Sequence, residues 1–234
     1  MTFRPTLWPT LFTVPVLIVL LGLGTWQLQR LTWKQDLIDK LHSRSTATAV
    51  SLPTGPLAPE DMEFQRVKVS GTFDHDNELL LVNRSLKGQA GLHVLTPLAR
   101  ADGAGTVLVN RGWIPFERRN RESRAEGLVE GTVTVEGLVR FAKGPGWFMP
   151  ENEPHNNSWF YVDPDAMAAA VGTNSLAGYY VMSSARDTPG GYPVGHQWQL
   201  NIRNDHLEYA ITWYALAVAL LVIYFLYHRK RGQE

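Results

Sequence analysis

Residues 7–26 read LWPTLFTVPVLIVLLGLGTW, an uncharged run of 20 residues. As a helix, this run would be about 30 Å long, which matches the hydrocarbon core of a bilayer. Pro9 and Pro15 interrupt it, but membrane helices tolerate proline where neighbouring groups satisfy the freed carbonyls. The competing interpretation is a cleaved secretory signal, because Arg4 precedes the run and small residues close it. The run is longer than a usual signal core, which favours a membrane-spanning helix.

A second uncharged run, residues 209–227, reads YAITWYALAVALLVIYFLY and has aromatic residues near both ends, as interfacial belts do. The basic residues that follow it favour a cytoplasmic C-terminus under the positive-inside rule, and two spans place the N-terminus on the same side. Basic residues also follow the first run, but long loops translocate largely regardless of charge, so the short tails decide. We predict a cytoplasmic N-terminus (1–6), a transmembrane helix (7–26), an extramembrane β-rich domain (27–208), a second transmembrane helix (209–227) and a cytoplasmic basic tail (228–234), in which His228 adds charge.

Composition excludes several classes of function. The charges of the 22 basic and 22 acidic residues cancel, so the overall charge gives no indication of nucleic-acid binding. Cysteine is absent, so there are no disulfides, thiolate nucleophiles or Cys-based copper and zinc sites, and five scattered methionines disfavour copper delivery. Because the sequence lacks H-E-x-x-H, G-x-S-x-G and P-loop motifs, we expect no enzyme activity.

The domain between the runs shows strand patterns. Residues 67–73 alternate apolar and polar side chains, and residues 133–139 repeat the pattern, each with a glycine in mid-strand, where sheets commonly bend. We therefore expect a strongly curved antiparallel sheet or an open barrel. Further predicted strands cover residues 78–83, 92–95, 106–113, 159–162 and 179–182.

Helical patterns are fewer. Apolar spacing of three and four continues from Trp26 to Leu41, so we expect the first helix to extend out of the membrane. Asp163 as a cap, Pro164 at the first position and Gly172 as a terminator predict a short helix inside the domain. Residues 143–158, rich in Gly, Pro and Asn, predict a long loop and a partner-contact surface. The predicted fold class is α+β with β dominant, with one or two helices in the domain.

Four segments resemble the Surfeit-locus family of cytochrome c oxidase assembly factors. They are residues 22–30 (GLGTWQLQR) with Trp33 and Lys34, 109–115 (VNRGWIP), 157–163 (NSWFYVD) and 204–214 (NDHLEYAITWY). Asp205 departs from the family pattern, which expects Asn or Glu there. The resemblance implies a non-enzymatic factor that acts with other assembly factors on subunit I of haem-copper oxidase and assists haem A insertion. Because few residues precede the first run, leaving no room for a transit peptide, we expect a bacterial inner membrane with the domain in the periplasm.

Given this resemblance, His206 is the candidate haem-iron ligand, since protein haems are held by His, Cys, Met or Tyr and cysteine is absent. On a helix it shares a face with Tyr209 and Trp213, at the outer membrane interface. If both termini are cytoplasmic, Gly22, Gly24 and Trp26 reach the same leaflet, where glycines allow close approach of a helix or a macrocycle. Arg30 and Arg203 are candidate partners for the haem propionates.

Each candidate also has a simpler interpretation. His206 with Asp205 is then an interfacial cap of the second helix, Trp26 and Trp213 are belt residues, and the glycines pack helices. Segment 109–115 is interpreted as structural, with Asn110 and Arg111 organising a buried polar network. A scaffold that stabilises oxidase subunit I without binding haem is the alternative function.

Overall fold

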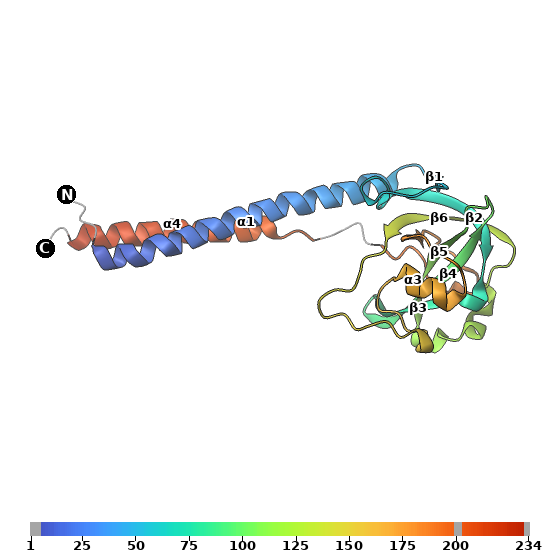
Figure 1. Cartoon of the computed structure of the whole chain (residues 1–234). Coiled ribbons are helices and arrows are strands. Elements are labelled where there is room, and N and C mark those ends of the chain that lie inside the picture. The colour runs from blue at the N-terminus through green and yellow to red at the C-terminus, as the bar shows by residue number, and fades with distance from the viewer. Residues whose placement is uncertain (1–5, 199–202, 232–234) are drawn as a thin grey trace. The chain divides into compact units, whose positions relative to one another are not determined.

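The computed structural model describes residues 6–198 and 203–231. The chain forms two compact units, which we describe separately: a helical unit made of residues 1–40 and 200–234, and a sheet-rich unit made of residues 41–199. Figure 1 shows the whole chain.

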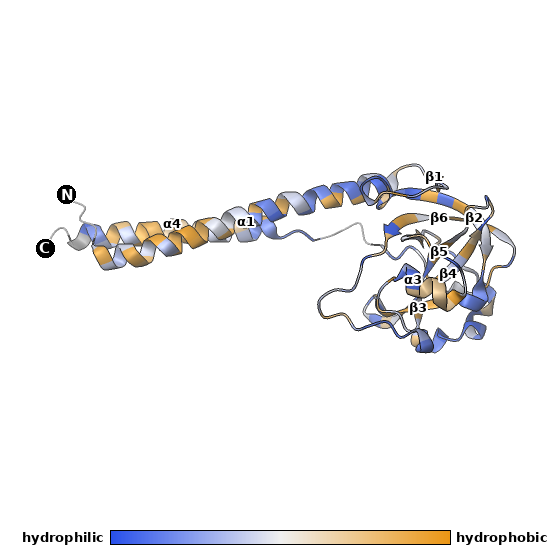
Figure 2. Ribbon diagram, in the orientation of Figure 1, coloured by the Kyte–Doolittle hydropathy of each residue, from blue (hydrophilic) through white to orange (hydrophobic). Residues whose placement is uncertain are grey.

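Two long helices form the helical unit: α1 (Leu7–Thr46), whose last turns belong to the sheet-rich unit, and α4 (His206–Arg231). Each contains a stretch long and apolar enough to cross a membrane by length and composition. Most side chains in these stretches are exposed, Phe12, Ile18 and Ile223 among them, as a lipid-facing surface requires. Figure 2 shows apolar residues giving way to polar ones in the second half of α1. Two candidate spans therefore flank a sheet-rich domain, as predicted, and the first helix extends well beyond its apolar run.

The two helices pack antiparallel. The backbone N–H of Thr6 donates to Nε2 of His228 over 3.1 Å, and the hydroxyls of Thr10 and Tyr224 lie 2.6 Å apart. Ala210 and Ala217 are buried on the same face of α4. The start of α1 therefore lies beside the end of α4, as two spans in sequence require.

His228 is a correction to the sequence analysis. We expected an exposed charge in the basic tail, but its side chain is fully buried. Since Nε2 accepts the N–H of Thr6, the other nitrogen carries the proton and donates to the Tyr224 carbonyl over 2.8 Å. His228 thus joins the two helices as a neutral imidazole.

The sheet-rich unit is a mixed seven-stranded sheet that closes on itself. Its order is β1-β2-β6-β7-β5-β4-β3, and an additional pairing of β2 with β4 closes the circuit β2-β6-β7-β5-β4 (Figure 1). The strands are β1 (Val50–Ser51), β2 (Arg66–Phe73), β3 (Leu79–Leu86), β4 (Gln89–Arg100), β5 (Thr106–Pro115), β6 (Thr132–Phe141) and β7 (Tyr179–Ser183).

The expectation of a curved sheet or barrel is confirmed, but the sheet is not wholly antiparallel. The pairs β1–β2 and β5–β7 are parallel. Strand β7 lies between β5 and β6, which run in opposite directions, so pairing antiparallel to β6 makes it parallel to β5. An arrangement of this kind depends on contacts far apart in the chain, and strand periodicity alone does not report it.

The mid-strand glycines lie where the sheet bends. Gly71 is paired with Val133 on one side and Arg100 on the other, at the point where β2 passes from β6 to β4. A Cβ atom built on Gly71 would lie 2.3 Å from the carbonyl oxygen of Ala99, and one built on Gly137 would lie 2.2 Å from that of Met182. Any larger residue at either position would therefore collide with the neighbouring strand.

Short helices and turns complete the domain. Helix α3 (Pro164–Val171) begins and ends as predicted: Asp163 Oδ1 accepts the N–H of Ala166 over 3.1 Å, and Gly172 adopts a positive φ of 69°. The other helical segments are α2 (Pro59–Met62) and the 3₁₀ turns η1 (His75–Asn77), η2 (Phe116–Arg118), η3 (Arg121–Gly127), η4 (Pro154–Asn156) and η5 (Pro189–Gly191).

Two strand predictions differ from the structure. Residues 159–162 form a single bridge, between Leu81 and Trp159, instead of a strand. Beyond that bridge, the Oδ1 atom of Asn152 accepts the N–H groups of Phe160 and Tyr161, so no ladder continues. Strand β4 is much longer than residues 92–95, because nearly every residue from position 91 onward is buried and the chain shows no apolar-polar alternation there.

Buried apolar side chains fill the closed sheet and the space beneath α3. One cluster lies among β2, β5, β6 and β7 and includes Val67, Val109 and Val181. A second joins β3, β4 and β5 to α3 through the fully buried Trp159 and Met167. The core therefore fixes both the barrel and the segment that enters α3.

The bend at Gly137 provides a test of barrel closure. We expect Gly137→Ala to lower the free energy of unfolding by about 1–3 kcal/mol, because the new methyl group overpacks against the Met182 carbonyl. Gly144→Ala is the matched control, since a Cβ atom at that position would have no atom within 4 Å. Thermal unfolding of both purified variants checks this, and equal midpoints would contradict the close approach.

Candidate functional site

The imidazole of His206 lies where α4 begins, beside α1. Its Nδ1 is 2.7 Å from Oε1 of Gln27. An amide oxygen only accepts hydrogen bonds, so Nδ1 is the donor, and in the neutral imidazole Nε2 is then the nitrogen with the lone pair. Within the described ranges, 6–198 and 203–231, Nε2 has no hydrogen-bond partner, and the side chain is half-buried. A histidine held through Nδ1 in this way is oriented to offer Nε2 as a metal ligand.

The neighbouring turn of α1 is packed tightly against α4. The ring of Tyr214 lies over Gly24, where a Cβ atom would be 2.8 Å from it, and the Tyr214 hydroxyl lies 3.1 Å from Oγ1 of Thr25. Gly24 therefore serves helix packing. At Gly22, by contrast, a Cβ atom would have no atom within 4 Å, so the surface above it is open to a flat ligand or another helix.

The predicted propionate partners have other contacts. The guanidinium of Arg30 lies 5.8 Å from the ring centroid of Trp26 and 5.1 Å from that of Trp33, in cation–π range. Arg203 pairs with Asp205 over 2.6 Å and is largely exposed. Among the described residues, no hydrogen bond or ion pair joins Arg30 or Arg203 to His206.

The aromatic candidates on the two helices are only partly covered. Trp26 and Tyr209 are each about half exposed, and Trp213 is half-buried. The structure thus brings His206 to the Gln27 turn, and within the described ranges no hydrogen bond joins the other predicted residues to its side chain. Sequence reasoning did not single out Gln27 or Tyr214, although both lie within the segments that carry the family resemblance.

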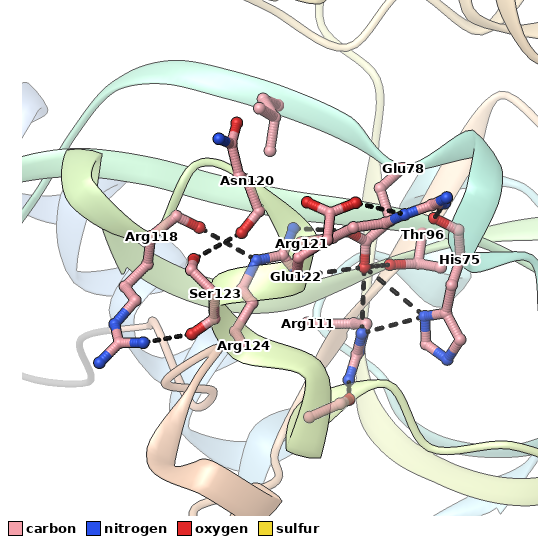
Figure 3. Close-up of polar contacts among 12 residues, drawn as sticks. His75, Glu78, Thr96, Arg111, Arg118, Asn120, Arg121, Glu122, Ser123 and Arg124 are labelled. Atoms are coloured by element: carbon pink, nitrogen blue, oxygen red, sulfur yellow. Dashed lines mark hydrogen bonds and ion pairs between the residues drawn. The ribbon is translucent and has the colours of Figure 1, made fainter.

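A second polar cluster lies inside the sheet-rich unit, around the buried carboxylate of Glu78 (Figure 3). Arg124 Nη2 donates to one carboxylate oxygen over 2.5 Å, and Arg111 Nη1 donates to the other over 3.2 Å. Thr96 adds a third hydrogen bond, of 3.3 Å. Burial raises the pKa of Glu78, but contacts with His75 and Arg124 and the charge of Arg111 outweigh it and lower the pKa to about 2.

This cluster fastens η3 to the barrel. Arg111, on β5, also donates to the carbonyl of Gly127, and His75 Nε2 lies 2.9 Å from the carbonyl of Val129. Asn110 and Arg111 are both buried, which confirms the prediction that segment 109–115 organises a buried polar network. The Glu78 cluster therefore holds the connection between β5 and β6 in place.

A cleft of about 430 Å³ opens beside the Glu78 cluster. The charged groups that line it are already engaged: Arg119 donates to the Asn156 carbonyl over 2.6 Å, Arg121 pairs with Asp76, and Arg124 with Glu78. The arginines of the cleft are thus committed to neighbours within the protein. In the part of the chain that the structure describes, no group of three or more His, Asp or Glu side chains could hold a metal ion.

A further buried polar pair, Asn110 and His93, joins β5 and β4. Asn110 Nδ2 donates to Nδ1 of the buried His93 over 3.2 Å, and its Oδ1 accepts the N–H of Gly112 over 3.1 Å. Burial, with a smaller contribution from the charge of Arg84, lowers the pKa of His93 to about 4. His93 is therefore a neutral core residue at physiological pH.

A sequence model of the SURF1 family matches residues 14–218, a range that contains all four motif segments. The chain belongs to the SURF1 family. It is 38% identical over 235 residues to a SURF1-like protein of Monosiga brevicollis, covering 96% of this chain and 88% of that protein. It is 38% identical to Surfeit locus protein 1 of Homo sapiens, covering 87% of this chain and 72% of that one, and 36% identical to that of Takifugu rubripes, covering 87% and 90%.

Removing the charge of Glu78 should destabilise this SURF1-family domain. We expect Glu78→Gln to cost about 3–5 kcal/mol of unfolding free energy, because Arg111 and Arg124 would keep buried charges without their anion. Asp76→Asn is the matched control: it breaks an exposed ion pair with Arg121 and should leave the stability nearly unchanged. Chemical denaturation of both variants measures the difference, and equal losses would show that burial adds nothing to the Glu78 cluster.

His93 predicts a pH dependence. In the unfolded chain it protonates near pH 6.5, whereas in the native barrel it does so only near pH 4. Stability should therefore fall as pH drops from 6.5 to 4, by about 3 kcal/mol from this residue. The stabilisation from Glu78, whose pKa is lowered from 4.5 to about 2, is lost between those two pH values and overlaps the His93 window only between pH 4.5 and 4. His93→Gln should flatten the profile between pH 6.5 and 4 in thermal melts, and parallel profiles would count against the assignment.

Proposed function

We propose that this chain is an assembly factor for haem-copper cytochrome c oxidase. It assists the insertion of haem A into subunit I by binding the haem transiently at the outer membrane interface. The observation that carries the proposal is the imidazole of His206, which Gln27 holds through Nδ1 so that Nε2 has a lone pair without a partner among the described residues. Membership of the SURF1 family supports the oxidase as the target.

The residues around His206 suit a haem. With a haem bound, Nε2 of His206 would be the protein ligand to its iron. The open surface at Gly22 and the half-exposed ring of Trp26 offer an apolar flank. Arg30 lies one helical turn further along α1 from Trp26 and is exposed, so its guanidinium would face a propionate as a bidentate donor. A single imidazole ligand on an exposed helix surface holds a haem less firmly than an enclosed pocket would, which suits a carrier.

The same proposal includes a topology. Both termini lie in the cytoplasm, and the sheet-rich domain lies in the periplasm of a bacterial inner membrane. The contact between Thr6 and His228 supports a shared side for the two termini, and the basic residues after Tyr227 support the cytoplasm as that side. The partners are oxidase subunit I, other oxidase assembly factors and lipid. The balanced charge favours no nucleic acid, and the chain acts without catalysis of its own.

The second candidate function is a scaffold that stabilises subunit I without binding haem. The packing of Tyr214 over Gly24 and the pairing of Arg203 with Asp205 favour it. Gly24 and Arg203, which the haem proposal assigns to the ligand, already have contacts within the protein. In this alternative, the helical unit offers its apolar surface to the helices of subunit I.

The two functions differ in an optical spectrum. The full chain, purified from cells that make haem A, should carry a haem absorption spectrum, and His206→Ala should lose it. Gln27→Leu should reduce haem occupancy on the order of ten-fold, since the imidazole loses the group that orients it. His155→Ala is the matched control, because this exposed histidine lies in the sheet-rich unit.

Two outcomes would contradict haem binding. A colourless wild-type protein that still co-purifies with subunit I would support the scaffold. Reporter fusions that place the two termini on opposite sides of the membrane would remove the shared leaflet on which the haem site depends.

A further inference from the structure

The loop between β6 and η4 presents the most exposed aromatic side chains of the sheet-rich unit. Trp147 is 99% exposed and Phe148 is 98% exposed. Figure 1 shows this loop standing away from the sheet, and Figure 2 shows its mixed hydropathy. Two neighbouring aromatic rings in full contact with water are unusual, because removing the apolar surface of each ring from water would lower the free energy.

The tip of this loop is an ordered turn. The N–H of Met149 donates to the carbonyl of Gly146 over 3.0 Å, which places Trp147 and Phe148 at the two central positions of the turn. The loop is fixed at its base, where the N–H of Ala142 donates to the carbonyl of Gly178 over 2.9 Å. On the other side, the amide of Asn152 is bonded to the 160–161 backbone. Hydrogen bonds at both ends of the loop therefore fix it to the domain, and its tip exposes the two rings to solvent.

The surroundings of the tip distinguish between possible partners. Besides Trp147 and Phe148, the exposed large hydrophobic residues of the described sheet-rich unit are Val50, Phe116 and Met149. Two rings offer about 400 Å², whereas a specific protein interface needs about 800 Å² from each partner. A small apolar tip without a larger apolar surface around it is too small for a stable protein contact. It is well suited to a bilayer interface, which accepts single Trp and Phe side chains.

Helix α1 also links this domain covalently to a candidate membrane span. The apolar run of α1 ends near Trp26, and the sheet-rich unit begins at Leu41, which leaves a helical connection about 22 Å long. Trp147 is six residues from the end of β6, and a chain of that length spans up to about 20 Å when extended. The extended loop is thus about as long as the part of α1 that connects the apolar run to the domain. Because this part of α1 links the domain to the bilayer, the effective concentration of the loop tip at the bilayer is high.

We propose that Trp147 and Phe148 insert into the interface of the bilayer that holds α1 and α4. The uncharged stretch from Gly144 to Pro150 enters the headgroup region, and Lys143, at the base of the loop, lies at the level of the lipid phosphates. The domain then has a third attachment to the membrane besides its two helices, which restricts its orientation. This inference stands apart from the haem proposal and uses none of the same residues.

The absence of native cysteine makes a direct test simple. A nitroxide label on Trp147→Cys, in the full chain reconstituted into phosphatidylcholine–phosphatidylglycerol nanodiscs, reports its surroundings through collision with oxygen or with a water-soluble nickel chelate. The matched control is a label on Glu130→Cys, an exposed position before β6. We expect nickel collisions at position 147 on the order of ten-fold rarer than at position 130, with oxygen collisions more frequent, as for a group within the interface.

A label at position 147 that collides with nickel as often as the one at position 130 would overturn the proposal. Protection of position 147 that arises only when oxidase subunit I is added would also overturn it, and would assign the tip to a protein partner. Since both substituted side chains are exposed, unchanged thermal midpoints will confirm that the labelled chains are folded.

Discussion

The antiparallel contact between α1 and α4 is the constraint on which the topology and the candidate site both depend. Lipid tails are as apolar as leucine, so helices in a bilayer associate through close packing and hydrogen bonds. Both are present here. Gly24, Ala210 and Ala217 let the backbones approach, and side-chain hydrogen bonds such as that between Thr10 and Tyr224 join the helices. The same pairing brings Gln27 to His206 at one end and Thr6 to His228 at the other.

The sheet-rich unit relies on a different kind of polar contact. Taking the carboxylate of Glu78 and two guanidiniums out of water is costly, and a well-packed apolar cluster would stabilise a domain at least as well. The ionic cluster adds directional contacts: its hydrogen-bond donors come from β5, η3 and β4, and each meets a defined oxygen. It therefore fixes the path of the long β5–β6 connection, for which apolar packing would leave alternatives.

The local features of this fold were predictable from the sequence, and the long-range ones were not. The two apolar runs, the extension of α1, the caps of α3 and the glycine bends of β2 and β6 each follow from a short stretch of residues. Strand β4 was predicted too short because burial on both faces removes the alternation that marks a strand. The strand at residues 159–162 was predicted wrongly because Asn152, a residue outside that stretch, accepts hydrogen bonds from its backbone N–H groups.

The candidate site shows the same division: His206 was identified through a family motif, but Gln27 and the buried position of His228 follow only from how the helices pair. A single sequence shows that both helices are apolar along much of their length, whereas the rotation and offset of the two helices depend on close contacts such as Tyr214 over Gly24.

Comparison of the two polar sites adds a physical argument for exchange at His206. In the Glu78 cluster, each carboxylate oxygen meets charged donors and the pKa is lowered to about 2, as in a permanent structural element. At His206, one nitrogen is fixed by Gln27 while the other lies at a half-buried position with no hydrogen-bond partner in the described part of the chain. The cost of leaving a nitrogen unpaired is small where water can reach it, so the native fold tolerates an open ligand position there. Under the proposed function, a group bound at that nitrogen would displace no hydrogen bond of the described residues, so its release would require no change in their contacts.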